Sequence, residues 1–233
     1  MKLNIQIKRK DVGGSRSWIT HLIAGVRNIR SHRGSITPVL YCLIACIAMN
    51  GALLGGTFQM KSAEMKLFNL VKQDKDQQRD ELSLDPILCK VARARATDMV
   101  KRNYFSHVNP DGKGANYLVE HAGYVLPDYY DHSAPANNIE SIGMSTGAAA
   151  GMLASWKKSK YHRPHLMGEI AFYKAQVRVG VGICTSSKAP YNKYFVFISA
   201  PPNASLNPPF WILKSPSGKV IATTGSAASA LPQ

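Results

Sequence analysis

Acidic residues are scarce in this chain of 233 residues, with 14 Asp and Glu against 29 Lys and Arg and a formal net charge of +15. The imbalance is concentrated at the start, because residues 1–35 contain eight Lys or Arg and a single acid, Asp11. The remaining sequence lacks a stripe of cations interleaved with aromatic residues, which is the usual mark of a nucleic-acid-binding surface. We therefore expect no nucleic-acid partner.

Charge of either sign is missing between Arg33 and Lys61, where the sequence is largely apolar. An apolar span of about 20 residues is what a helix needs to cross a bilayer. A basic flank before such a span stays in the cytoplasm and directs the following chain outward. We predict a basic cytoplasmic segment or n-region at 1–35 and a hydrophobic signal or membrane anchor at 36–58.

The rest of the chain is then exported, and two fates stay open. It is either anchored and facing outward, in the periplasm or on the cell surface, or secreted after cleavage. Cys46 lies in a stretch that resembles a lipidation signal, but apolar sequence continues beyond it, so a plain membrane cysteine is favoured.

Cysteines are few, and only Cys89 and Cys184 follow the apolar segment. A disulfide between them suits an oxidising compartment. Two separate buried thiols are equally compatible with the sequence, because the spacing along the chain does not give the distance between them.

Hydrophobic periodicity and turn residues predict helices early and strands late. Asp85 and Pro86 have the residue types of a helix N-cap and first helical position. Lys90, Arg93, Arg95 and Asp98 fall on the face that we assign to solvent. The expected helices lie near 64–72, 86–102, 114–122 and 146–158, and the expected strands at 177–183 and 194–200. This order predicts an α+β layered domain at 62–202 with a mainly antiparallel sheet. A C-terminal hairpin extension at 203–224 and a flexible tail at 225–233 follow.

Two similar stretches place a histidine after an aromatic residue and a small polar residue. His107 follows Tyr104-Phe105-Ser106 at the end of a predicted helix, and His162 follows Trp156 and Ser159. A helix end followed by a polar turn can hold an imidazole at the rim of a cleft. We predict that His107 and His162 face each other across one groove.

Several short motifs occur here in a characteristic order, including Leu84-Asp85-Pro86, Tyr104-Phe105-Ser106-His107, Ala122-Gly123-Tyr124, Trp156-x-x-Ser159-x-x-His162-Arg163 and Val179-Gly180-Val181-Gly182. Over about residues 64–202 the chain resembles the CAP superfamily (cysteine-rich secretory proteins, antigen 5 and pathogenesis-related proteins) in its bacterial SCP-like form. The resemblance implies a three-layer α-β-α sandwich, usually secreted, with a central groove that holds two histidines and acidic residues and in some members zinc.

By motif match, the two groove histidines are His107 and His162. The first acid of the family stands before an Asn-Ile pair, and in this sequence that position is Asn137. The acid is therefore absent or displaced to Glu140. This departure from the family pattern bears directly on metal binding, because an amide side chain only hydrogen-bonds.

Two neutral imidazoles can ligate Zn²⁺, and a catalytic zinc site adds a third protein ligand and an open position. His107, His162 and Glu140 are thus the candidate metal ligands and the candidate catalytic residues. Neither serine beside the histidines lies in a Gly-x-Ser-x-Gly elbow. Residues expected around the groove are Ser106, Asn137, Asn138, Ser159 and Arg163.

The favoured function is a ligand-binding, envelope-associated module that takes a lipid or a cell-wall component and is tied to the membrane by its N-terminal segment. Enzymatic activity is less favoured. A metal-assisted hydrolase of peptide or cell-wall material is the alternative from the enzyme class. In a third hypothesis, the domain is a scaffold in which both histidines are structural.

Overall fold

The computed structural model describes residues 56–187, 191–205 and 208–225, all within a compact unit that spans residues 50–233. The predictions for segment 1–35, for Cys46 and for the tail beyond 225 lie outside the described residues. The same holds for the predicted anchor up to residue 55. Among the residues described, no helix is both long and apolar enough to cross a bilayer.

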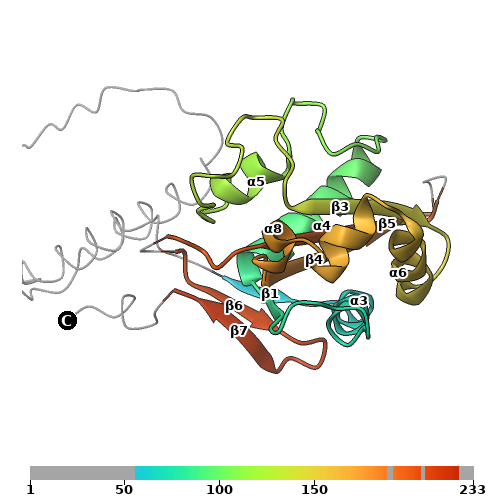
Figure 1. Ribbon diagram of the computed structural model, residues 1–233. Coiled ribbons are helices and arrows are strands. Elements are labelled where there is room, and N and C mark those ends of the chain that lie inside the picture. The colour runs from blue at the N-terminus through green and yellow to red at the C-terminus, as the bar shows by residue number, and fades with distance from the viewer. Residues whose placement is uncertain (1–55, 188–190, 206–207, 226–233) are drawn as a thin grey trace, which may run out of the picture. The chain divides into compact units, whose positions relative to one another are not determined.

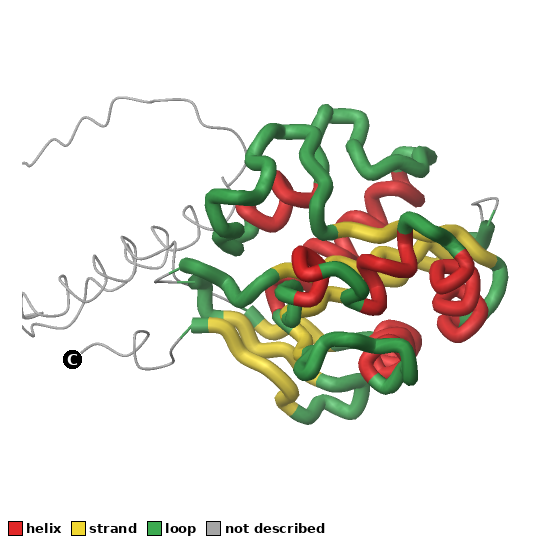
Figure 2. Tube along the Cα trace, viewed as in Figure 1, coloured by secondary structure: helices red, strands yellow, loops and turns green. Residues whose placement is uncertain are grey.

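Most helices of the described chain lie in its first part, and the longest strands lie in its second part (Figures 1 and 2). The helices are α3 (Ser62–Lys72), α4 (Pro86–Lys101), α5 (Ala115–His121), α6 (Ala149–Lys158), α7 (His162–Met167) and α8 (Ala171–Lys174). The strands are β1 (Thr57–Gln59), β2 (Ser83–Leu84), β3 (Glu140–Ser145), β4 (Arg178–Thr185), β5 (Lys193–Ala200), β6 (Trp211–Lys214) and β7 (Val220–Thr224).

The strands form two mixed sheets, a larger one in the order β2-β4-β5-β3 and a smaller one in the order β1-β6-β7. The prediction of a mainly antiparallel sheet is therefore wrong. Strand β2 runs parallel to β4, and β1 runs parallel to β6. Strands β1 and β2 are each followed directly by a helix. The chain between each of them and its later partner strand is long enough to return and run in the same direction.

Helix α4 begins where the sequence predicts. The Asp85 carboxylate accepts hydrogen bonds from the backbone N–H groups of Ile87 and Leu88, at 2.8 and 3.1 Å, and Pro86 takes the first helical position. A side-chain acceptor here satisfies backbone donors that have no partner within the helix.

Glycines in β4 allow α4 to lie unusually close to the larger sheet. A Cβ atom added to Gly180 would lie 2.1 Å from the carbonyl carbon of Leu88, and one added to Gly182 would lie 2.2 Å from that of Ala92. The opposite face of β4 carries Val179, Val181 and Ile183. These side chains belong to a core shared with α3, α6 and α7. The larger sheet therefore has helices on both faces.

Cys89 and Cys184 are both free thiols. Of the two alternatives that the sequence leaves open, the structure contains the one without a disulfide. Cys89 is fully buried against β4, and burial raises the pKa of its thiol above the usual range. A buried thiol of this kind is unreactive.

The close approach of α4 to β4 gives a first prediction. Gly182→Ala should lower the free energy of unfolding by at least about 2 kcal/mol, because the new methyl group overlaps the α4 backbone. Gly151→Ala is the matched control, since an added Cβ there meets nothing within 4 Å. Urea denaturation of the full-length protein measures both, and equal stability of Gly182→Ala and the wild type would contradict the packing described above.

Candidate functional site

The turn that carries His107 follows directly from the end of α4. Asn103 has a φ of 51°, a left-handed conformation that terminates helices. Further along, the Asn109 side chain accepts hydrogen bonds from the backbone N–H groups of Asp111 and Lys113, at 3.0 and 2.9 Å. These bonds form a turn at 109–112, which closes the loop in which His107 lies.

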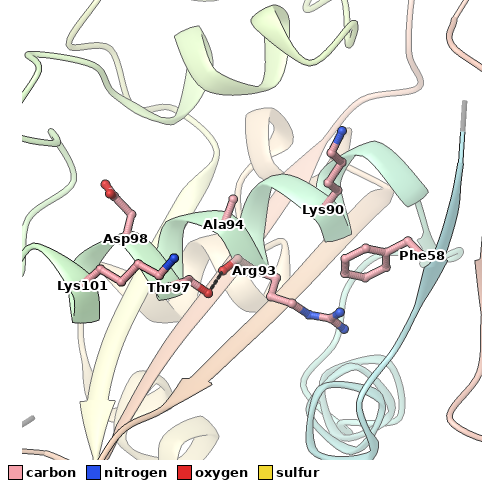
Figure 3. Close-up of a pocket in the computed structure, with 7 residues that line it drawn as sticks. All are labelled: Phe58, Lys90, Arg93, Ala94, Thr97, Asp98 and Lys101. Carbon is pink, nitrogen blue, oxygen red and sulfur yellow. Dashed lines mark hydrogen bonds between the residues drawn. The ribbon is translucent and has the colours of Figure 1, made fainter. Parts of the chain in front are cut away.

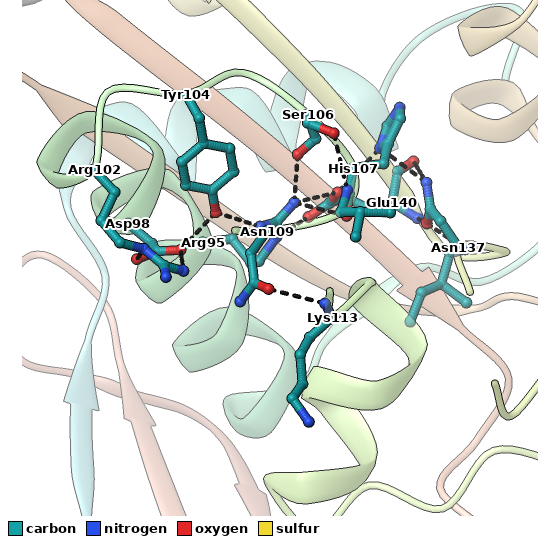
Figure 4. Close-up of polar contacts among 12 residues, drawn as sticks. Arg95, Asp98, Arg102, Tyr104, Ser106, His107, Asn109, Lys113, Asn137 and Glu140 are labelled. Carbon is teal, nitrogen blue, oxygen red and sulfur yellow. Dashed lines mark hydrogen bonds and ion pairs between the residues drawn. The ribbon is translucent and has the colours of Figure 1, made fainter. Parts of the chain in front are cut away.

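A buried arginine donates hydrogen bonds to the backbone of this loop. Arg95 is 2% exposed, and its Nε and Nη2 atoms donate to the two carboxylate oxygens of Glu140, at 2.8 and 3.1 Å. Nη2 also donates to the carbonyl oxygens of Ser106 and His107, at 2.8 and 3.0 Å, and Nη1 donates to the Tyr104 hydroxyl at 2.7 Å. Figure 4 shows the guanidinium lying between Tyr104 on one side and Ser106, His107 and Glu140 on the other.

His107 meets two polar groups at one ring nitrogen. Its Nδ1 lies 3.1 Å from Glu140 Oε2 and 2.9 Å from Asn137 Nδ2. The side chain is 41% exposed, whereas that of Glu140 is fully buried. Within the described residues no group pairs with Nε2 of His107, so this nitrogen is left for an external partner.

The orientation of the Asn137 amide is fixed by the backbone. Its Oδ1 accepts from the N–H of Glu140 at 2.9 Å and from the N–H of Ile139 at 3.3 Å. Its Nδ2 donates to the carbonyl oxygen of Glu140 at 3.2 Å. Since the oxygen is committed to two backbone donors, the group that faces His107 is the NH₂.

His162 begins the short helix α7 and has one serine as its partner. Ser159 Oγ lies 2.9 Å from His162 Nδ1, and the same oxygen accepts from the backbone N–H groups of Tyr161 and His162. Burial lowers the pKa of His162 below its usual value, and the charge of His107 adds to this shift. No contact joins His107 and His162 among the described residues, and their pairing across one groove stays a prediction.

Arg79 fixes the far end of α7. Its guanidinium donates to the carbonyl oxygens of His165 and Leu166, in the last turn of the helix, and to that of Tyr173. Burial lowers the pKa of this arginine to about 10. His165 itself is buried between Ser141 and Ser199, and burial lowers its pKa well below the usual value. It thus belongs to the packing of α7 against the sheet.

The other residues expected around the groove have local partners. Asn138 Oδ1 accepts from Asn116 and from the backbone of Asp131, and so organises the loop before β3. Arg163 pairs with Glu169 and Asp76, at 2.6 and 3.2 Å. Ser106 takes part through its carbonyl oxygen on Arg95, while its hydroxyl oxygen accepts from the backbone of Val108.

Sequence reasoning missed Arg95, which it assigned to the solvent-facing side of the helix. A usable signal was present in the spacing. Leu88, Ala92, Arg95 and Met99 follow one another at intervals of four, three and four residues, which is the spacing of one buried helix face. An arginine within such a stripe requires a buried acid, and Glu140 supplies it.

The residues present do not fit the zinc site implied by the sequence. Among the described residues, no group of three or more His, Cys, Asp or Glu is arranged to hold a metal ion. Glu140, the candidate third ligand, uses both carboxylate oxygens on Arg95, and Asn137 directs an N–H toward His107. A zinc ion would have to displace the buried ion pair to gain a carboxylate ligand.

Comparison with known proteins gives a match to one family model, described as the cysteine-rich secretory protein family (CAP), over residues 67–199. No curated protein sequence matches the chain.

Solved structures with a similar arrangement have low sequence identity. An outer surface protein from Borrelia burgdorferi is 15% identical, with 60% of this chain and 93% of that chain covered and a TM-score of 0.47. An extracellular protein containing a SCP domain from Bacillus anthracis is 20% identical, with 60% and 40% covered and a TM-score of 0.46. The venom allergen-like protein 4 from Schistosoma mansoni is 16% identical, with 68% and 99% covered and a TM-score of 0.34.

The buried ion pair gives a second prediction. Arg95→Ala should lower the free energy of unfolding by about 3–5 kcal/mol, because it leaves the Glu140 carboxylate buried without a counter-ion. Arg102→Ala is the control, since Arg102 pairs with Asp98 and Asp111 at the surface, and its loss should cost less than about 1 kcal/mol. Chemical denaturation compares the two variants, and a loss for Arg95→Ala no larger than for Arg102→Ala would refute the structural role of the pair.

Proposed function

The chain belongs to the cysteine-rich secretory protein (CAP) family, and from this premise we propose that it is an exported envelope protein that binds a ligand in a groove between His107 and His162. Export and membrane attachment are supported by the basic residues 1–35 and the uncharged apolar segment that follows them. The hydrogen-bonding roles of the two histidines determine which type of ligand the groove binds.

The contact between Asn137 and His107 carries the proposal. A neutral imidazole has one donor and one acceptor nitrogen. Because the amide of Asn137 directs its NH₂ at Nδ1 of His107, 2.9 Å away, we assign Nδ1 of the neutral ring as the acceptor and its proton to Nε2, so that Glu140 Oε2, 3.1 Å from Nδ1, receives no hydrogen bond from this ring. Protonation of the ring, with Nδ1–H donating to Glu140, also leaves a hydrogen on Nε2.

His162 reaches the same state through Ser159. The serine oxygen already accepts from two backbone N–H groups, so its hydroxyl hydrogen is free to donate to Nδ1 of His162. The lowered pKa of His162 favours the neutral ring at neutral pH. In this neutral form the proton again lies on Nε2.

The groove therefore presents two imidazole N–H donors to its ligand. Donors of this kind bind oxygen acceptors, and charged oxygens such as those of a carboxylate or a phosphate bind most strongly. Peptide carboxylates of cell-wall material and phosphates of envelope lipids both carry such groups. The groove selects, on this proposal, for an acidic envelope component.

The same tautomers disfavour both metal binding and hydrolysis. Zinc requires the lone pair of an unprotonated ring nitrogen, and in the proposed tautomers each Nε2 holds a hydrogen instead. The oxygen of Ser159 is engaged by two backbone N–H groups, which lowers its nucleophilicity.

Binding of a carboxylate probe tests the proposal. N-acetyl-alanyl-alanine with a free carboxylate should shift the side-chain NMR signals of both His107 and His162 in the full-length protein, whereas the same peptide with an amidated C-terminus should shift them much less. His107→Gln and His162→Gln should each weaken binding by about tenfold, the loss of one hydrogen bond to a charged group. The control is His132→Gln, because His132 pairs with Glu120 on an exposed loop. Equal shifts with the acid and the amide would contradict the proposed acceptor.

A change at Asn137 should convert the groove to a zinc site. Asn137→Asp replaces the NH₂ with an acceptor oxygen, so Nδ1 of His107 becomes the donor and Nε2 gains a lone pair for the metal. Zinc affinity should rise by about tenfold or more, the usual effect of a carboxylate behind a histidine ligand.

Asn138→Asp is the matched control, since it adds the same charge one residue away, where the side chain contacts Asn116. Isothermal titration calorimetry of the full-length proteins gives the affinities. If wild type and both variants bind zinc equally, Asn137 does not set the tautomer of His107.

A further inference from the structure

A hollow on the outer side of α4 is separate from the histidine groove. It has a volume of about 350 Å³ and lies between α4 and the smaller sheet. Its lining is Phe58, Lys90, Arg93, Ala94, Thr97, Asp98 and Lys101. Figure 3 shows Phe58 of β1 beside the Lys90 and Arg93 side chains of α4. The hollow thus combines an aromatic wall with several cations.

Lys90 and Lys101 have no acidic partner among the described residues. Arg93, by contrast, pairs with Glu64 and stacks on Phe58, with 3.9 Å between the guanidinium carbon and the ring centre. Lys90 Nζ lies 4.1 Å above the Trp211 ring, and Lys101 makes no ion pair with any residue of the described ranges. Both lysines are exposed.

The acid in the lining does not offset these charges. Asp98 already pairs with Arg102 at 2.6 Å and accepts a hydrogen bond from the Tyr104 hydroxyl. The hollow therefore presents uncompensated positive charge, which selects for an anionic partner.

Chain connectivity indicates which anionic partner lies within reach. Phe58 lines the hollow and is the last residue of the predicted membrane segment at 36–58. The polar headgroup layer on each side of a bilayer is roughly 5–8 Å thick. A chain that leaves the membrane at the end of this segment thus holds Phe58 beside the headgroup layer.

We propose that this hollow, with Lys90 and Lys101 at its edge, docks on anionic phospholipid headgroups of the membrane in which the chain is anchored. The proposal rests on the membrane attachment proposed above. The lysine ammonium groups contact headgroup phosphates, while Phe58 and the Trp211 ring below Lys90 lie at the depth where aromatic residues favour the membrane interface. Docking gives the domain a defined face toward the bilayer.

Lysine acetylation in vesicles tests this docking. The full-length protein is reconstituted into phosphatidylcholine vesicles with or without phosphatidylglycerol, and a water-soluble acetylating reagent is applied while mass spectrometry follows each lysine. Phosphatidylglycerol should slow acetylation of Lys90 and Lys101 by about threefold or more, since surface charge acts within roughly 8 Å. Lys158, at the end of α6, and Lys160, two residues beyond it, are internal controls on the other side of the larger sheet and should be unaffected.

Two matched variants test the role of the charges. Lys90→Gln should reduce the protection of Lys101, because the docking face loses one cation, whereas Lys158→Gln should leave it unchanged. Protection of Lys101 that is equal in both variants would overturn the assignment of the face.

The remaining outcomes separate the hypotheses. A protein that does not co-float with either vesicle contradicts the membrane attachment itself. A protein that co-floats but shows equal acetylation with and without phosphatidylglycerol contradicts only the docking. Protection by soluble glycerol phosphate in phosphatidylcholine vesicles would show a site for free anions and would also overturn the proposal.

Discussion

The buried pair of Arg95 and Glu140 is the interaction on which the site depends. It joins helix α4 to strand β3, and the same guanidinium holds the carbonyl oxygens of Ser106 and His107. A single side chain thereby fixes a helix, a strand and the loop between them. Because both carboxylate oxygens of Glu140 accept from Arg95, this side chain is committed to structure, and this commitment limits what else the histidine site can do.

This ion pair can form only because α4 packs closely on the larger sheet. Gly180 and Gly182 remove the side chains that would keep the helix backbone away from β4. From that position the Arg95 side chain reaches Glu140. Glu140 lies on the edge strand β3, where it is paired with Ile198 of β5. The small residues in β4 and the buried charges in α4 and β3 are thus parts of one arrangement.

Local signals made much of the fold predictable. The cap at Asp85, the alternation through Val179 and Val181 and the turn at 109–112 depend on neighbours in sequence, and the structure contains all three. The parallel strands β1 and β2 were missed because segments of two or three residues carry no periodicity. Arg95 was missed because its burial depends on a partner 45 residues away in the chain.

In the candidate site, too, local sequence predicts some features and distant contacts determine others. Two recurring short patterns pair His107 with His162 across one groove, and this pairing stays a prediction. The role of each ring nitrogen was beyond the sequence, because it follows from the direction of the Asn137 amide and of the Ser159 hydroxyl. Those directions come from backbone N–H groups positioned by the start of β3 and of α7.

The protonation of the two histidine rings is the most direct test of this account. Long-range ¹H–¹⁵N NMR of the full-length protein at about pH 8, above the ordinary histidine pKa, distinguishes the two neutral tautomers, and the His107→Gln and His162→Gln variants assign the signals. We predict that both rings carry the proton on Nε2 and have Nδ1 as the acceptor. A His107 signal with the proton on Nδ1 would contradict the role of Asn137 and, with it, the proposal that the groove binds an oxygen acceptor.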